Sequence, residues 1–116
     1  MARAVRRAGG GRLSEPAPPR QPPAGWVIGV HVEVRGEPGT SRHFFAIGHA
    51  DRAKAEWTAV DWAQKVGDVA VSPVRGDEPV QMLGALTASM MGKLGLKPAE
   101  VRELGVKWPR RWLTED

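Results

Sequence analysis

Residues 26–48 carry the strongest structural signal in the chain, because two stretches there alternate between large apolar residues and other residues. WVIGVHVEVR, residues 26–35, is rich in β-branched residues, and RHFFAIG, residues 42–48, follows after GEPGTS. A period of two over such lengths predicts β-strands that bury one face. The segment between them is typical of a tight turn with Pro38 and Gly39 as its central residues. We therefore predict a β-hairpin.

The position of this turn sets the register of the predicted hairpin. Val30 then faces Ile47, and the apolar residues of both strands share one face, as a buried face requires. A slip of one residue would bring polar residues onto that face. In this register, His31 lies on the opposite face from His43 and His49.

A helix is predicted next, from about Arg52 to Val66, within HADRAKAEWTAVDWAQKVG. Asp51 is a favourable N-cap, Gly67 is favourable just past the end, and alanines are frequent. Trp62 lies off the stripe that is expected to face the core. That stripe consists of Ala53, Trp57, Val60, Ala63 or Gln64, and Val66 or Gly67.

The rest of the chain is predicted to add one strand and two helices. DVAVSPV, residues 68–74, reads as a short strand, and Pro73 indicates an edge or a strand end. Residues 79–94 and 98–104 have the apolar spacing of helices, with Gly95 past the end of the first. The order ββαβαα with a right-handed crossover gives a three-stranded sheet of order 2-1-3. We therefore predict an α+β fold, a small two-layer sandwich with helices covering one face of the sheet.

The first 25 residues differ from the rest in composition. They hold five arginines, one glutamate, five prolines and only three bulky apolar residues. Such a segment buries too little apolar surface to fold, so we predict a disordered tail, 1–25, before a single domain, 26–116. The net charge of +4 lies wholly in this tail. A basic arm suits a nucleic acid or an acidic protein, and the alternative is a solvated extension.

The composition also excludes several classes of protein. There is no cysteine, so disulfides, thiolate metal ligands and a cysteine nucleophile are excluded. No apolar run approaches the ~20 residues that a membrane-spanning helix needs. We expect a cytoplasmic protein that does not engage a membrane.

KWPRRW, residues 107–112, interleaves three cations with two indole rings. This combination suits phosphate contact with stacking on exposed bases, and Trp and Arg are equally common anchors of protein interfaces. The alternative is that both tryptophans cover the core while the arginines stay solvated. The candidate binding residues are Trp62, Trp108, Arg110, Arg111 and Trp112.

HFFAIGHADRAKAEW, residues 43–57, gathers two histidines, an aspartate and a glutamate. His43 and His49 stand about 20 Å apart at the rise of a strand, too far to share one metal ion. Asp51 is expected to cap the helix, which leaves His49 with Asp51 as the one pair suited to acid–base chemistry. No P-loop, dinucleotide, zinc-protease or nucleophile-elbow motif occurs. We therefore predict no catalytic residue, no metal and no cofactor.

These observations favour a small binding or interaction module without catalytic activity. Its expected partner is a protein or a second copy of the chain, bound by the C-terminal residues, Trp62 or an exposed sheet edge. The alternative is a nucleic-acid-binding protein that uses the basic arm and KWPRRW. The second alternative is a small metal-dependent or hydrolytic enzyme that uses His49 and Asp51.

Overall fold

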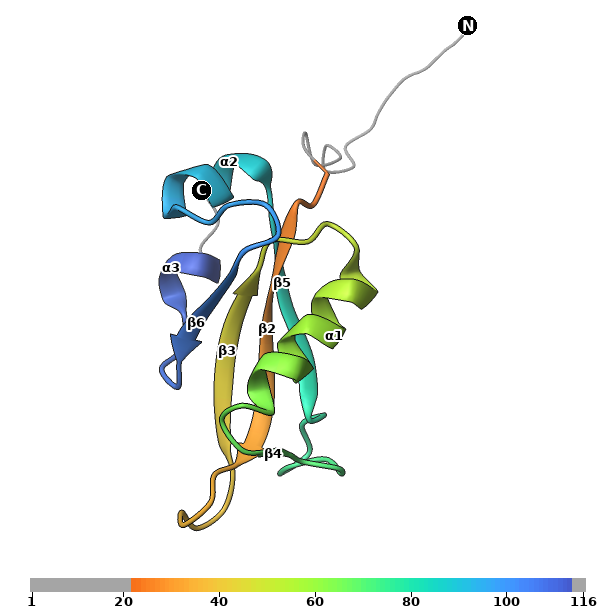
Figure 1. Ribbon diagram of the computed structural model, residues 1–116, viewed down its shortest axis with the longest axis vertical. Helices are drawn as coiled ribbons and strands as arrows, with labels where there is room; N and C mark the ends of the chain where they lie inside the picture. Colours follow the sequence, from red (N-terminus) through yellow and green to blue (C-terminus); the bar gives the residue numbers. More distant parts are fainter. Residues whose placement is uncertain (1–21, 114–116) are drawn as a thin grey trace, which may run out of the picture.

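A computed structural model describes residues 22–113 of the chain, and Figure 1 shows their arrangement. The strands form one antiparallel sheet of order β4-β2-β3-β6, and β5 also pairs with β2. The predicted class, a small α+β domain with a sheet and a few helices, is confirmed. The elements are β2 (Gly25–Glu33), β3 (Ser41–Ile47), α1 (Arg52–Ala63), β4 (Asp68–Val69), β5 (Val80–Leu86), α2 (Ala88–Leu94), β6 (Val101–Gly105) and α3 (Arg110–Leu113).

The β2–β3 hairpin has the predicted faces but a different register. Val30 pairs with His43, and His31 pairs with Arg42. The predicted pairing of Val30 with Ile47 is therefore wrong. The observed register differs from the predicted one by an even number of residues, so His31 and His43 still lie on opposite faces of the sheet.

The register differs because the chain reverses earlier than predicted. Glu37 N donates to Val34 O over 3.0 Å, and Gly36 between them has a φ of 87°. A positive φ at the third residue is what a type II turn requires, and glycine supplies it without strain. Pro38 and Gly39 belong to the longer loop that leads into β3.

The largest correction concerns residues 79–86 and 98–104, which were predicted to be helical. The first forms β5 and most of the second enters β6, so the predicted three-stranded sheet of order 2-1-3 is wrong. The helix of this region is only α2. Thr87 Oγ1 accepts a hydrogen bond from Met90 N over 3.1 Å and caps its start, and Gly95 ends it with a φ of 78°.

The spacing of three in β5 and β6 has a structural cause. The sheet is buried on both faces. Val80 and Val101 pack against the first core cluster, on the first face, while Leu83 and Leu104 pack against the second core cluster, on the second face. A β-bulge at Leu83 then places residues 83 and 86 on the same face. Apolar residues three apart are also what an amphipathic helix shows, and the pattern alone does not separate the two.

Helix α1 covers the first face of the sheet (Figure 1). Asp51 Oδ1 accepts a hydrogen bond from Lys54 N over 3.0 Å, which confirms the predicted N-cap. The predicted core stripe is correct at Ala63, which is buried, and wrong at Trp57, which is 70 % exposed. Small side chains let the helix approach the bulky residues of the strands closely. The residues that α1 buries are Ala55, Ala59 and Ala63.

The second face of the sheet is covered in part by α2 and α3. A second core cluster there joins Val27 and Ala46 from the sheet to Met91 from α2 and Trp112 from α3. Helices therefore pack on both faces, and the predicted cover of one face alone is wrong.

The predicted disordered tail, residues 1–25, lies mostly outside the described residues. Of its last residues, Gly25 begins β2 and Ala24 N donates to Leu86 O over 2.7 Å. No helix within residues 22–113 is both long enough and apolar enough to cross a membrane.

Candidate functional site

Beyond the second core cluster, the second face presents a group of polar and aromatic side chains. His31 from β2 pairs directly with Arg42 from β3, and Phe44 follows on the same face. Gly29 lies beside them, and a Cβ there would be 3.3 Å from Arg42 Cδ and 3.4 Å from Phe44 Cδ1. The absence of a side chain at Gly29 thus gives Arg42 and Phe44 room to lie along β2.

Trp108, in the segment between β6 and α3, lies over these residues. Its ring meets Phe44 edge-on, with centroids 5.7 Å apart and an interplanar angle of 84°. The Arg42 guanidinium lies 5.1 Å from the Phe44 centroid and 5.5 Å from that of Trp108. Arg42 Nη1 also donates to Gln81 Oε1 over 2.8 Å. These contacts fix Arg42, while Trp108 is still 53 % exposed.

A tight turn brings two further charges to the same place. Val74 N donates to Asp77 O over 2.8 Å, and Asp77 N donates to Val74 O over 2.9 Å. The central residues Arg75 and Gly76 have φ values of 50° and 88°. Two positive φ values are the pattern of a type I′ turn, whose first central position favours Asn, Asp or Gly. Arg75 therefore holds a backbone conformation that residues with a side chain rarely adopt.

Together these pieces enclose a pocket of about 400 Å³. His31 is its most buried polar member, with 4 % exposure, and neither imidazole nitrogen has a hydrogen-bond partner within residues 22–113. The nearest carboxylate oxygen, Asp77 Oδ2, is 3.9 Å from His31 Nε2, beyond hydrogen-bond reach. The lining residues are His31, Ser41, Arg42, Phe44, Arg75, Asp77, Val106 and Trp108.

The surroundings of His31 favour its neutral form. Burial lowers the pKa of His31 and Arg42 lowers it further, Asp77 acts in the opposite direction, and Arg75 lowers it again. The approach of Asp77 by itself would favour the imidazolium, but burial and the two guanidinium groups outweigh it. The pocket thus combines two positive charges, one negative charge and an imidazole whose pKa is lowered.

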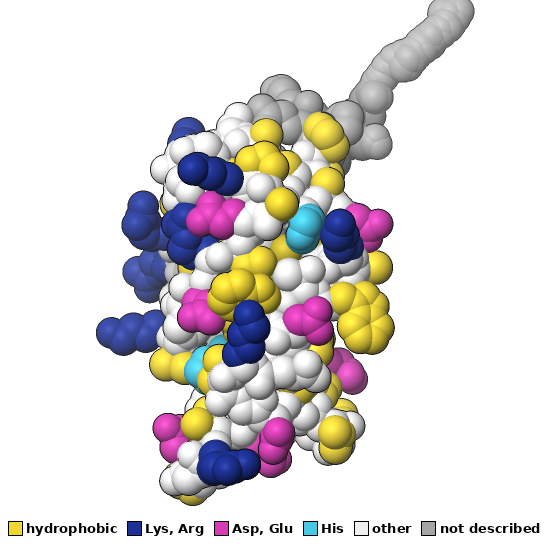
Figure 2. Space-filling view, in the orientation of Figure 1, with side chains coloured by type: hydrophobic (Ala, Val, Ile, Leu, Met, Phe, Trp, Pro, Cys, Tyr) yellow, Lys and Arg dark blue, Asp and Glu magenta, His cyan; other side chains and the backbone are white. Residues whose placement is uncertain are grey.

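A strongly basic surface adjoins this pocket. Residues 93–113 hold six Lys and Arg against two Glu, whereas residues 22–92 hold six against eight acidic residues. The described part of the chain therefore has a net charge of +4 in its last fifth and −2 in the rest. Figure 2 shows Lys and Arg side chains gathered on the side where α2, β6 and α3 lie. We call this surface the basic edge; it comprises Lys93, Lys97, Arg102, Lys107, Arg110 and Arg111.

The structure separates the predicted binding residues into different environments. Trp108 lines the pocket, and Arg110 and Arg111 are exposed on α3. Trp112 is in the second core cluster, with only 9 % exposure. Trp62 is half-buried on α1, on the other side of the sheet, and packs against the first core cluster. Lys65 Nζ lies 4.2 Å from the centroid of the Trp62 ring.

The pair predicted for acid–base chemistry lies in the loop between β3 and α1. The carboxylate of Asp51 is engaged by the backbone of α1, and His49 is half-buried. The three histidines do not converge, because His31 and His43 project from opposite faces. Within residues 22–113, no group of three or more His, Asp or Glu side chains could hold a metal ion.

Sequence reasoning missed the four ionisable residues of the pocket, which are His31, Arg42, Arg75 and Asp77. Alternation along the hairpin indicates that His31 and Arg42 share a face, which was an available signal. The sequence gives no comparable sign that Arg75 and Asp77 return to them. The basic edge was hidden because the charges of the domain were added together, and their sum over residues 26–116 is zero.

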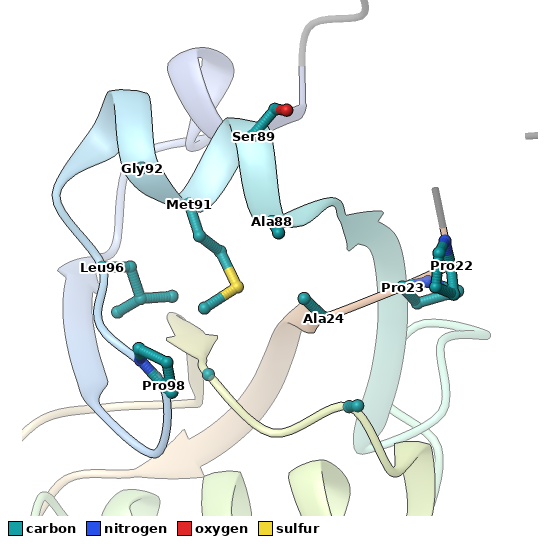
Figure 3. A pocket seen from close by; sticks show the side chains of 11 residues that line it. Pro22, Pro23, Ala24, Ala88, Ser89, Met91, Gly92, Leu96 and Pro98 are labelled. Atoms are coloured by element: carbon teal, nitrogen blue, oxygen red, sulfur yellow. The ribbon is translucent and has the colours of Figure 1, made fainter. Parts of the chain in front are cut away.

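A larger pocket, of about 730 Å³, lies between α2, the end of β3 and the first described residues (Figure 3). Met91 points into it from α2, and Leu96 and Pro98 form another wall. Among the described residues that line it, Ser89 alone has a polar side chain. Ligand sites usually add several placed polar groups to an apolar wall, so this pocket offers little to orient a ligand.

No family model, curated protein or solved structure matches this chain.

Proposed function

We propose that this domain is a non-catalytic binding module whose ligand is a single-stranded nucleic acid. The observation that carries the proposal is that residues 93–113 hold six Lys and Arg residues together with a half-exposed tryptophan, Trp108. Proteins that bind single strands combine a cationic track for the backbone with aromatic rings on which bases stack. Here the basic edge supplies the track and Trp108 the ring.

The surface favours recognition by charge over recognition by apolar contact. The exposed large apolar residues are distributed over separate elements, with Trp57 on α1, Val71 after β4, and Val106 and Trp108 after β6. A protein interface usually has a contiguous core that excludes charged residues. A protein partner or self-association is therefore the weaker proposal, and an acidic protein is the form of it that the basic edge would fit.

A single strand suits this surface better than a duplex. Reading a duplex in the major groove needs a projecting helix or a two-stranded ribbon. Two short helices contribute to the basic edge. α2 has seven residues and carries only Lys93 of this set, and α3 has four residues, with its Trp112 occupied in the core. An exposed ring such as Trp108 is instead accessible to an unpaired base.

The proposal predicts a steep dependence of binding on salt. For single strands, log K falls with log salt at a slope of about −0.7 per phosphate contact. Four contacts give a slope of about −2.8, or about 50-fold weaker binding between 50 and 200 mM salt. We would measure anisotropy of a labelled oligo-dT or oligo-rU with the full chain over this range.

Variants then locate the contacts. The double variant Arg110→Gln/Arg111→Gln is expected to reduce the steepness of the slope by about 1.4. The matched control is Arg35→Gln/Lys54→Gln, which removes two exposed charges away from the basic edge and should keep the wild-type slope. Trp108→Ala should weaken binding by about 5- to 150-fold through lost stacking, with Trp108→Phe intermediate. Equal salt slopes for the two double variants would contradict the proposal. Binding of poly-glutamate as tight as that of the oligonucleotide would identify an acidic protein as the partner instead.

A further inference from the structure

We propose that the pocket beneath Trp108 binds a phosphomonoester group carried on a flat ring, as in a nucleoside monophosphate. The same chemistry occurs in a free nucleotide and at the phosphorylated end of a nucleic acid. This inference does not depend on the basic edge, because it rests on His31, Arg42, Arg75 and Trp108.

The two arginines give the pocket its preference for a doubly charged anion. A guanidinium presents a fork of N–H donors that matches phosphate oxygens. Arg42 is already oriented by Gln81 and by the rings of Phe44 and Trp108. Asp77 Oδ2 lies 4.0 Å from Arg42 Nη1 and offsets one of the two positive charges. A phosphomonoester carries about −1.5 to −2 charges at pH 7, whereas a diester inside a chain carries one, so the monoester gains more.

His31 lines the same pocket and carries hydrogen-bonding groups that are not in use. Its side chain is 94 % buried, yet neither imidazole nitrogen has a partner within residues 22–113. A buried polar group left without a partner costs free energy, and buried imidazoles are ordinarily hydrogen-bonded. Both nitrogens are closed off from solvent in the structure, so the imidazole would turn toward the pocket for its N–H to donate to a phosphate oxygen between the arginines.

The backbone at Arg75 points to the same use of the pocket. A φ of 50° at the first central residue of a type I′ turn is far better tolerated by Asn or Gly than by Arg. Strained residues of this kind cluster at ligand sites, where the side chain has a role that offsets the strain. The role available to Arg75 is its positive charge beside His31 and Arg42.

Trp108 accounts for the flat ring. It stands at the rim of the pocket, and half of its surface is exposed although the Arg42 guanidinium lies against it. A base attached to the bound phosphate could therefore stack on the indole. The pocket volume of about 400 Å³ is within the usual range for small-ligand sites.

The test is a titration of the full chain followed by the NMR signals of its histidine side chains at pH 7.5. The probes are adenosine 5′-monophosphate, adenosine, and one oligonucleotide with and without a 5′-phosphate. We expect the His31 signals to shift with the monophosphate and not with adenosine. His43, on the other face, and His49, beyond β3, serve as internal controls and should not move. No shift of His31 with any phosphorylated probe, or the same shift with adenosine, would overturn the inference.

Variants separate this pocket from the basic edge. Arg75→Gln should weaken binding of the monophosphate at least about tenfold, because a neutral amide replaces a charged guanidinium. His31→Gln should also weaken it, because a flexible amide replaces the buried imidazole. Lys54→Gln, on α1, and Arg110→Gln/Arg111→Gln should bind it as the wild type does. Wild-type affinity in Arg75→Gln, an exposed turn residue whose loss leaves the core intact, would refute the inference even if His31→Gln folded poorly. Preference for the phosphorylated oligonucleotide over the monophosphate identifies a nucleic-acid end as the source, and the reverse identifies a free nucleotide.

Discussion

Replacing Arg75 with Asn should stabilise the fold and weaken ligand binding at once. The left-handed conformation costs an ordinary L residue about 1–2 kcal/mol, and Asn adopts it several times more often than residues such as Arg. The gain expected for Arg75→Asn, at a φ of 50°, is therefore about 0.5–1 kcal/mol. In a domain of this size that raises Tm by about 2–8 °C.

The sequence contains a matched control in Arg35→Asn. Arg35 and Arg75 are both exposed turn residues followed by a glycine with a φ near 90°, 87° at Gly36 and 88° at Gly76. Arg35, however, is outside the left-handed region, because the only described residues other than glycine with a positive φ are Arg75 and Ala99. Asn at position 35 thus has no strain to relieve, and we expect little change in Tm.

The assay is thermal unfolding at pH 7.5, with and without adenosine 5′-monophosphate. A ligand that binds only the folded state stabilises it by RT ln(1 + [L]/Kd). Arg75→Asn should therefore be more stable than wild type without ligand and gain less from its addition. The reasoning is refuted if Arg75→Asn melts no higher than Arg35→Asn. It is also refuted if the ligand raises the Tm of Arg75→Asn as much as that of the wild type.

Three further substitutions test the account of the fold. His31→Leu removes buried nitrogens that have no partner, and should raise the free energy of unfolding by about 1 kcal/mol at pH 7. Because burial lowers the pKa of His31 in the folded state, the unfolded chain takes up a proton more readily. The free energy of unfolding of the wild type should therefore fall as pH drops below about 6.5. Urea unfolding at pH 7.5 and at pH 5.5 measures this loss, which should be smaller for His31→Leu than for the wild type. Gly48→Ala should cost about 1–3 kcal/mol, because its Cβ would lie 2.5 Å from the backbone oxygen of Lys97. Gly92→Ala, where a Cβ would meet no other atom, should instead raise the free energy of unfolding by up to about 1 kcal/mol. Similar losses of stability in both variants would show that the close approach of the backbone at Gly48 is not decisive.

The hairpin shows which parts of the site the sequence could reveal. Alternation alone established that His31 and His43 lie on opposite faces, because the faces depend only on whether the register is even or odd. The turn chemistry then pointed to Pro38-Gly39, and the shifted register moved His31 away from Arg42. This error hid the pocket, since His31 and Arg42 become neighbours only in the observed ladder. Trp108 was found because its residue type and cationic neighbours needed no register.

The burial of both sheet faces explains why the pocket and the failed helix predictions occur together. On the first face, α1 lies along the sheet, so residues such as Val80 and Val101 are covered. On the second, Leu83 and Leu104 pack against the cluster that α2 and Trp112 complete. Covering both faces removes the alternation that marks a strand, which is why these segments resembled helices. The cover of the second face then ends with α3, which has four residues. Beyond it, among residues 22–113, the segment around Trp108 and the Val74–Asp77 turn close over β2 and β3. There the sheet carries His31 and Arg42 in place of apolar residues.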